Sequence, residues 1–466
     1  MNLKKIRNFA SNSCHGNSCG VKMEKRFWFL LIIILFCAGC GLTNDYNAKA
    51  ILDFEEPETF EMLLNEMSNE DIVLLGESTH GTQEFYEIRS DISKELIKEH
   101  DFGFIAVEGD WDSIYQLNLY VKGLSDKNSA SEIMNNFDRW PRWMWANEEI
   151  RNLVEWLKEY NEGLPYEDKV GIYGMDVYGA ENSIIAVESI IGQQYDCLSQ
   201  FKDDFSGYAN YLSFGNTPCI EEAHEVYEII RSNSNSNMGE ELGDEKFFYL
   251  EQSALVVKNA ELHHRAMVDQ RLSSWNTRVM HMNKTVGRLM DLYDGGGIVW
   301  AHNTHVGDAR ATEMADTNRV NIGQLLRESY NDKSDGNGDG NGDGNGDSNN
   351  DGRERDSVFI LGFGTFEGEV LAGRGWGQQM EIMEIPKANA NSYEALLEGK
   401  GPENSLINLR SPNLPEELKA INNNRAIGVV YNPEVEYPGN YVKTDLKKRY
   451  DSFIFIRETN YLRLIE

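Results

Sequence analysis

A carboxylate and an imidazole stand three residues apart in residues 76–81, which read Gly-Glu-Ser-Thr-His-Gly. The stretch follows an apolar run at 72–75, and residues 82–100 repeat apolar side chains at helical spacing. Glu77 and His80 are therefore predicted to lie in a strand-to-helix turn, where open α/β sheets bind ligands. The positive end of the helix dipole favours a neutral imidazole, the form that a general base needs. Taken alone, the stretch also fits a polar turn with no chemical role.

Other apolar runs end in ionisable side chains as well. These runs and the residues that follow them are 104–107 with Glu108, 171–174 with Asp176, and 297–300 with His302 and His305. A later run at 427–430 brings no acid or histidine, and it is predicted to belong to the same sheet. Because the carboxyl ends of parallel strands share one edge of a sheet, all these acids and histidines are expected to gather there with Glu77 and His80.

The elements that must position these residues alternate between short apolar runs and helical patterns. This alternation predicts an α/β fold with a mainly parallel sheet flanked by helices. With 466 residues, one large unit with insertions or two domains are both expected. Residues 181–292 carry helical patterns without a clear strand, so a helical insertion over the carboxyl edge of the strands is predicted. The last strands are expected at 358–361, 427–430 and 453–456.

Several motifs at these positions resemble those of the erythromycin esterase family. They are the 76–81 turn, Phe85 and Arg89 on the helix after it, Val107-Glu108, the tryptophan-rich stretch 140–149, Gly174-Met175-Asp176, residues 300–305 (Trp-Ala-His-Asn-Thr-His), 425–431 and 450–453. The resemblance covers about residues 51–466. One stretch departs from the family, which tends to show an Arg-Asp pair before a Met-Ala on a long helix. Here Val279 follows Arg278, and Asn283 follows Met282.

The resemblance implies an ester hydrolase that works without a serine nucleophile. His80 would take a proton from a water molecule that attacks an ester or macrolactone carbonyl, and Glu77 would orient His80 or the water. Such an activity would give macrolide resistance. Ser78 is a rival nucleophile, but it lacks the Gly-x-Ser-x-Gly turn of serine hydrolases.

The remaining residues of the set would stabilise the transition state of ester hydrolysis or orient the groups that do so. The resemblance implies that His302, His305 and Arg89 stabilise the developing oxyanion, a contribution that is usually large. Glu108 and Asp176 would orient these groups. No cofactor is needed for this chemistry.

A second interpretation comes from the same broad superfamily, which is similar to haem-binding lipoproteins and metal-dependent peptidases. His80, His302, His305 and a carboxylate would suit Zn²⁺ or Mn²⁺, so a divalent metal or haem is the alternative. The other histidines are expected to be surface or packing residues. They are His100, His224, His263, His264 and His281.

The N-terminal segment resembles an export signal. Residues 23–40 combine Lys25 and Arg26 with an apolar core at 27–36, which is too short to span a bilayer comfortably. The ending Cys-Ala-Gly-Cys resembles a bacterial lipobox, which predicts a lipid on Cys40 and an exported, membrane-anchored protein. An ordinary cleaved signal is the alternative. Met23 is a natural start, which would make residues 1–22 an upstream extension, and residues 41–50 are expected to form a tether.

The net charge limits the possible binding partners, and the cysteines bear on disulfide formation. The formal net charge of −32 argues against nucleic acid, since phosphate binding needs a basic surface. After processing, Cys197 and Cys219 would remain, and in an oxidising compartment they could form a disulfide or stay as separate thiols.

Trp140, Trp143 and Trp145 could wall a cleft for a large apolar substrate or pack the helical layer on the sheet.

An Asp/Gly/Asn-rich tract interrupts the second half of the chain. Residues 335–352 contain no apolar side chain, so residues 331–356 are predicted to form a disordered loop. Asp343, Asn345, Asp347 and Glu354 fall at EF-hand spacing, which makes calcium binding an alternative. Ser348 stands where that loop needs glycine.

Overall fold

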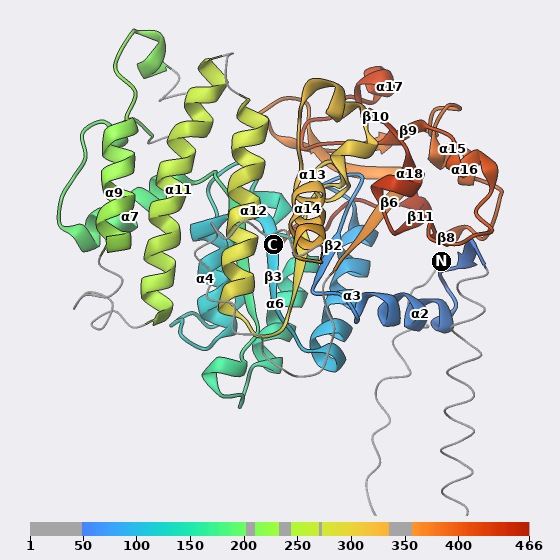
Figure 1. Cartoon of the computed structure of the whole chain (residues 1–466), viewed down its shortest axis with the longest axis horizontal. Helices are drawn as coiled ribbons and strands as arrows, with labels where there is room; N and C mark the ends of the chain where they lie inside the picture. Colours follow the sequence, from blue (N-terminus) through green and yellow to red (C-terminus); the bar gives the residue numbers. More distant parts are fainter. Residues whose placement is uncertain (1–48, 202–209, 233–243, 270–272, 335–356, 466) are drawn as a thin grey trace, which may run out of the picture.

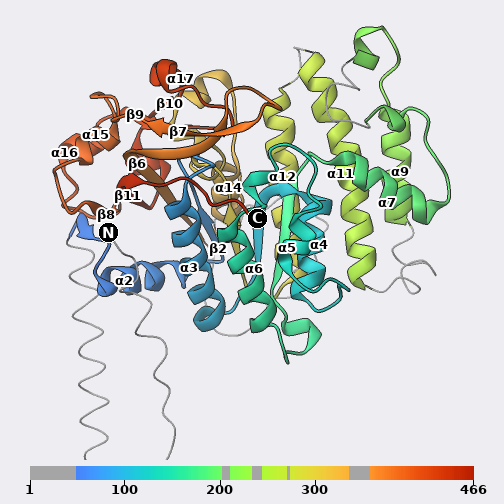
Figure 2. The same ribbon diagram turned by 180° about the vertical axis from the view of Figure 1, so that it is seen from behind.

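The computed structural model describes residues 49–201, 210–232, 244–269, 273–334 and 357–465. Its centre is a nine-stranded sheet in the order β1-β8-β11-β6-β2-β5-β3-β4, and β7 pairs with β6 beside this path. Helices α12 and α14 lie on one face of the sheet (Figure 1), and α3 and α6 lie on the opposite face (Figure 2). The predicted α/β fold is confirmed.

Most pairs in the sheet are parallel. The parallel neighbours are β11–β6, β6–β2, β2–β5, β5–β3 and β3–β4, while β1–β8, β8–β11 and β6–β7 are antiparallel. The strands are β1 (Ile51–Asp53), β2 (Ile72–Leu75), β3 (Phe102–Asp110), β4 (Gly171–Asp176), β5 (Gly296–Trp300), β6 (Val358–Gly373), β7 (Met380–Ile385), β8 (Asn404–Asn408) and β11 (Ser452–Thr459). A separate antiparallel pair is formed by β9 (Asn422–Arg425) and β10 (Tyr441–Thr444).

The helices fill the connections. Those of ten or more residues are α2 (Pro57–Met67), α3 (Gln83–His100), α4 (Trp111–Val121), α6 (Glu148–Tyr160), α7 (Ala180–Ile191), α9 (Ile220–Ser232), α11 (Asp244–Val268), α12 (Ser274–Leu292) and α14 (Ile322–Ser334). The shorter ones are α5 (Ala130–Met134), α13 (Asn303–Val306), α15 (Tyr393–Leu397), α16 (Glu416–Lys419), α17 (Glu436–Gly439) and α18 (Leu446–Arg449). The 3₁₀ turns are η2 (Arg142–Met144), η3 (Tyr166–Asp168), η4 (Leu198–Phe201), η5 (Ala309–Ala311), η6 (Glu313–Thr317) and η7 (Pro433–Val435).

The apolar runs before the candidate residues form the middle of the sheet. Every residue of β2, β4 and β5 is buried, as expected for strands covered by helices on both faces. Helix α3 begins directly after Thr82 and buries Phe85, Ile92 and Leu96. Sheet and helix therefore form where the sequence predicts them, and the 76–81 turn joins them.

The prediction that residues 427–430 form a strand of this sheet is wrong. Ile427 makes an isolated bridge to Thr79, and Val430 makes one to Gly373. The amide of Ile427 donates to the carbonyl of Ser78 at 2.7 Å, and the amide of Gly373 donates to Val429 at 3.0 Å. The segment therefore crosses between the turn after β2 and the end of β6, where no continuous ladder is available.

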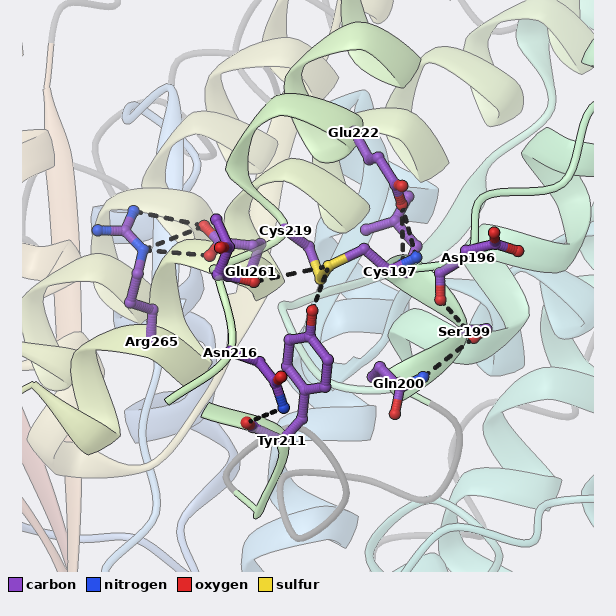
Figure 3. Close-up of a disulfide and its surroundings, with 12 residues drawn as sticks. Asp196, Cys197, Ser199, Gln200, Tyr211, Asn216, Cys219, Glu222, Glu261 and Arg265 are labelled. Atoms are coloured by element: carbon purple, nitrogen blue, oxygen red, sulfur yellow. Dashed lines mark hydrogen bonds and ion pairs between the residues drawn. A yellow bond between two sulfur atoms is a disulfide. The ribbon is translucent and has the colours of Figure 1, made fainter. Parts of the chain in front are cut away.

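The segment 181–292 contains only helices in its described parts. Helix α11 packs against α7, α9 and α12, and α12 also packs against β4 and β5 (Figure 1). Cys197 and Cys219 form a disulfide with Cα atoms 5.5 Å apart (Figure 3). A carboxylate oxygen of Glu222 accepts from the amides of Cys197 and Leu198 at 2.9 and 3.0 Å, so the start of α9 is also tied to η4 by hydrogen bonds.

Several sequence predictions fall outside the described residues. They concern the extension 1–22, the signal 23–40 with Cys40, most of the tether 41–50, and the tract 335–352. Within the part that the structure describes, no helix is long and apolar enough to cross a membrane.

Candidate active site

Four adjacent strands bring the predicted residues to one edge of the sheet. The strands β2, β5, β3 and β4 are consecutive neighbours and run parallel. Glu77 and His80 follow β2, His302 and His305 follow β5, Glu108 lies near the end of β3, and Asp176 ends β4. Arg89 reaches the same place from α3. The structure therefore gathers the whole predicted set, and each of these residues is buried.

The turn after β2 builds one half of the site. Glu77 Oε1 lies 2.8 Å from His80 Nδ1, and Glu77 Oε2 accepts a 2.5 Å hydrogen bond from Arg89 Nη2. Because Nδ1 of His80 is engaged by Glu77, its Nε2 is left for a substrate or a water molecule. Position 81 must be glycine, because a Cβ there would lie 1.9 Å from the carbonyl oxygen of Leu371. The turn thus depends on a glycine to lie this close to β6.

The pKa of His80 is governed by its carboxylate partner as well as by burial. Burial alone would lower the pKa of His80, but the hydrogen bond and negative charge of Glu77, with help from Glu108, raise it above the usual 6.5. The sequence prediction considered only the helix dipole, whereas the adjacent carboxylate of Glu77 favours the protonated form. A histidine held by a carboxylate in this way is a stronger base than a free one.

A second cluster forms across β3, β4 and α12. Arg278 Nη2 donates to Glu108 Oε1 at 2.7 Å and to Asp176 Oδ2 at 2.6 Å, and its Nε donates to Asp176 Oδ1 at 2.9 Å. Burial opposes ionisation of both acids, yet Arg278 lowers the pKa of Asp176, and His305 together with Arg278 holds the pKa of Glu108 well below its usual value. Both carboxylates are therefore charged at neutral pH.

His302 and His305 lie between these two clusters. The rings of His302 and His80 are 4.9 Å apart, and the amide of His302 donates to Glu108 Oε2 at 2.9 Å. His305 Nε2 lies 3.3 Å from Glu108 Oε1 and 3.2 Å from Arg278 Nη1. Burial, with the neighbouring His80, lowers the pKa of His302 well below its usual value, and Glu108 and the Ser78 carbonyl oppose this only in part. His302 is therefore neutral at pH 7.

The tautomer of His302 follows from its neighbours. The amide of Thr304 donates to His302 Nδ1 at 3.3 Å, so Nδ1 is an acceptor. In a neutral imidazole the other nitrogen then carries the proton. His302 Nε2 is buried and makes no hydrogen bond of normal geometry among the described residues, although the carbonyl of Ser78 lies close enough to the ring to raise its pKa. The site therefore contains a preset N–H donor next to His80.

Hydrogen bonds of Asn303 hold the loop that carries His302 and His305 on the sheet. Its amide donates to the carbonyl of Glu77 at 2.8 Å, and its side chain donates to the carbonyl of Phe363 at 2.6 Å. Arg449 Nη2 donates to the carbonyl of Asn303 at 2.9 Å. The loops that carry His80 and His302 are thus joined directly.

Sequence reasoning missed three residues that shape the site. Arg278 joins Glu108 to Asp176, Trp275 stacks on His305 with ring centroids 4.5 Å apart, and Thr304 sets the tautomer of His302. A signal for Arg278 existed, since it is the arginine of the stretch that departs from the family pattern. Nothing in the sequence around Trp275 marks it.

The tryptophans of the 140–149 stretch have different roles. Trp143 and Trp145 are buried, and Trp145 Nε1 donates to the carbonyl of Glu108 at 3.0 Å, so both pack the interior. Trp140 is only half-buried and lies 4.7 Å from Trp376. Among the remaining histidines, His263 is buried in the helical insertion and His224 is exposed. Within the described residues, no group of three or more His, Cys, Asp or Glu side chains is arranged to hold a metal ion.

The fold and the site define an α/β protein with a histidine–carboxylate–arginine centre at the carboxyl ends of parallel strands. A family model described as erythromycin esterase matches residues 97–334 and 352–459. The chain therefore belongs to the erythromycin esterase family. It is 18% identical over 423 residues to a protein from Escherichia coli described as erythromycin esterase type II, covering 84% of this chain and 90% of that protein.

Solved structures share this fold. A protein from Bacillus cereus superposes with a TM-score of 0.67 at 18% identity, covering 91% of this chain and 99% of the other. A succinoglycan biosynthesis protein gives 0.63 at 20% identity, with 91% and 98% covered. A mutant of the erythromycin esterase EreC in its open conformation gives 0.60 at 16% identity, with 88% and 95% covered.

Proposed function

We propose that the chain is a carboxylic ester hydrolase in which His80 activates a water molecule. The observation that carries the proposal is the Glu77–His80 pair, 2.8 Å apart and buried beside the ring of His302. Glu77 holds the imidazole by Nδ1, so Nε2 can take a proton from water. Family membership supports an ester as the substrate.

The neighbouring groups suit a carbonyl that becomes negatively charged. Nε2–H of neutral His302 would donate to the oxyanion, because its proton is preset and it makes no hydrogen bond of normal geometry among the described residues. Arg278 and His305 both contact Glu108 and would hold its carboxylate in place beside the histidines. Arg89 is fully buried against Glu77, so its proposed role is to hold Glu77 rather than to touch the substrate.

We propose a macrolactone or another bulky ester as the substrate, which would give resistance to macrolides. The test is to incubate the purified protein with macrolides and with simple esters and to follow the products by mass spectrometry. The expected product is the acid formed by addition of one water. Failure to cleave any ester in the panel would contradict the proposed function.

Two controls separate the alternatives. Ser78→Ala should keep the activity, because the proposal assigns no step to the Ser78 hydroxyl. A folded but inactive Ser78→Ala protein, together with an acyl intermediate trapped on Ser78 of the wild-type protein, would favour a serine mechanism. Metal analysis and haem titration of the same preparation test the metal- or haem-binding alternative, in which stoichiometric metal or a Soret band would appear.

We also propose that the protein is exported and anchored to a membrane by a lipid on Cys40. The support is the signal-like sequence of residues 23–40 and the disulfide, a bond typical of oxidising compartments. Cys40→Ser should release the protein from the detergent phase or block its processing. Equal membrane retention of the unlipidated variant would contradict the lipid anchor.

A further inference from the structure

Hydrogen bonds from distant segments hold both ends of the turn after β2. At the first end, the carbonyl of Glu77 accepts from the amide of Asn303 at 2.8 Å. At the second end, the carbonyl of Gly81 accepts from an amide of β6 at 3.1 Å and from the amide of Leu462 at 3.0 Å. Because Glu77 belongs to the first end and His80 to the second, the 2.8 Å contact between their side chains depends on both sets of hydrogen bonds.

One of these amides belongs to the last part of the chain that the structure describes. We call residues 460–465 the C-terminal strap, which leaves β11 and crosses the starts of α3 and α6 (Figure 2). Tyr461 makes an antiparallel bridge with Thr82, directly before α3, and Leu464 makes one with Asn147, directly before α6. The strap therefore joins the start of the helix after the turn to a second helix on the same face of the sheet.

Side chains fix the strap at each of these helix starts. Both carboxylate oxygens of Glu84, in the first turn of α3, accept from Asn460: Oε2 accepts from its amide at 2.9 Å and Oε1 from its Nδ2 at 2.7 Å. The carbonyl of Asn460 accepts in turn from the amide of Gln83 at 2.9 Å. At the other helix, Arg463 Nε donates to Glu149 at 2.7 Å. These contacts fix the register of the strap, and with it the position of the amide that binds the turn.

Glycine makes the second end of the turn dependent on these hydrogen bonds. Gly81 has no side chain that could pack, and glycine loses more conformational freedom on folding than any other residue. Its backbone is held from outside, by the strap and by β6, where the carbonyl of Leu371 occupies the space that a Cβ would need. A looser strap would therefore let His80, the residue before Gly81, move relative to Glu77.

We propose that the C-terminal strap positions the general base of the ester hydrolase, and that Asn460 is the positioning residue that fixes the register of the strap. This inference rests on the proposed function, because that function assigns the base to His80. The strap makes no contact with the reacting groups. It acts through the carbonyl of Gly81, which keeps the imidazole within hydrogen-bond distance of Glu77.

The test disrupts the contact between Asn460 and Glu84 and then rebuilds it with the partners exchanged. Asn460→Asp replaces the Nδ2 hydrogen bond by repulsion between two carboxylates. The kcat for p-nitrophenyl acetate should fall about tenfold, because small displacements of a catalytic group are costly, while KM stays within about twofold. Glu84→Gln combined with Asn460→Asp restores an amide–carboxylate pair and should recover most of the kcat.

The matched control is Asn404→Asp, which makes the same chemical change away from the turn. Asn404, at the start of β8, donates through Nδ2 to Glu55 at the same distance of 2.7 Å. Its kcat and KM should stay within about twofold of the wild-type values. Equal losses of kcat in Asn404→Asp and Asn460→Asp would show a general effect of the added charge and would overturn the proposal.

A titration of His80 tests the strap without any turnover. Its imidazole signal is followed by NMR and assigned by its loss in His80→Ala. An added carboxylate would by itself raise the pKa of His80, whereas a weaker contact with Glu77 lowers it. The midpoint in Asn460→Asp should therefore fall by about 0.5 pH units, and the exchanged pair should restore it.

The titration also keeps the two proposals distinguishable. A lowered midpoint supports the strap even if the wild-type protein cleaves no ester, in which case only the proposed function fails. An unchanged or raised midpoint in a folded Asn460→Asp protein would overturn the strap. An Asn460→Asp enzyme that cleaves the ester with a kcat within about twofold of the wild-type value would overturn it as well.

Discussion

Two arginines pair with carboxylates in this site, and they arrive there by different routes. Arg89 and Glu77 are 12 residues apart in the chain, and both side chains are almost completely buried. Arg278 is 102 residues from Asp176 and 170 residues from Glu108, and it retains 15% exposure. The first pair is produced by one turn and the helix after it. The second forms only when α12 packs against the sheet.

Glu77 of the first cluster and Arg278 of the second act on the pKa of His80 in opposite directions, while Glu108 of the second cluster acts in the same direction as Glu77. Glu77 raises the pKa of His80, and Arg278 lowers it. The cluster formed locally by Glu77, His80 and Arg89 therefore supplies the base. The cluster formed over long distance by Arg278, Glu108 and Asp176 adjusts the strength of that base and orders the histidines after β5. Loss of each cluster should therefore produce a different defect.

The largest effect is expected at the base itself. His80→Ala should lower the rate of ester hydrolysis by about 10²- to 10⁴-fold, the usual cost of losing a positioned general base. Circular dichroism and thermal melting should show a folded protein. Near-normal turnover by a folded His80→Ala protein would mean that the local cluster does not carry the chemistry.

Removal of the long-range arginine should cost stability. Arg278→Gln leaves Glu108 and Asp176 buried without their cation, so the free energy of unfolding at neutral pH should fall by about 3 kcal/mol or more, as measured by urea denaturation. The control Arg288→Gln changes an arginine on the same helix as Arg278. It breaks the more exposed ion pair between Arg288 and Glu251 of α11 and should cost about 1 kcal/mol or less.

The pH dependence of this loss has a definite sign. Arg278 lowers the folded pKa of Glu108 and Asp176, so the stability they contribute is present above their unfolded values and is lost as the pH falls through the folded values. Without Arg278, burial raises both pKa values. The stability gap between wild type and Arg278→Gln should therefore shrink on acidification. A gap that grows at low pH would contradict this account.

The disulfide should matter to the outer helices more than to the site. It closes a loop with a sequence separation of 22 residues, for which loop entropy predicts about 3 kcal/mol. Replacing Cys197 and Cys219 by serine should therefore speed hydrogen exchange in α7 and α9. Activity should persist, because α12 is held by β4 and β5. Loss of activity in the double variant would show that the outer helices also hold Arg278.

The pH profile of kcat/KM distinguishes the two clusters directly. The base must be neutral, so activity should rise with pH through a pKa above 6.5 in the wild type. Glu77→Gln should move this rise to lower pH, and Arg278→Gln should move it to higher pH by a smaller amount. Shifts of the same sign in both variants would contradict their opposite effects on His80.

The smallest effect is expected from the Asp/Gly/Asn-rich tract. Deletion of residues 335–352 should leave activity and Tm nearly unchanged, because the tract has no apolar side chain to bury. Loop length itself matters little, since each doubling changes the closure cost by only about 0.6 kcal/mol. Calcium-dependent stability that disappears with the deletion would reveal a binding site in the tract.

Much of the site could be predicted because its members mark the ends of apolar runs. Glu77 and His302 follow strands, and Glu108 lies near the end of one. The buried residues of these strands are visible in the sequence, and parallel pairing brings such ends together. The order of the strands was not predictable from these runs. The same evidence predicts that the segment 427–430 is a strand of the sheet, and only its pairing partners show that it crosses between the turn after β2 and the end of β6.

The sequence by itself determined the central strands β2, β3, β4 and β5, the helix after the 76–81 turn and the identity of the acids and histidines at the sheet edge. These features depend on apolar periodicity and on short separations along the chain. The tertiary structure alone decided that Arg278 joins Glu108 to Asp176, that Trp376 meets Trp140, and that His80 has a raised pKa. Each of these features depends on the distances between side chains in the folded protein. Electrostatic and packing energies vary with those distances, and sequence patterns do not contain them.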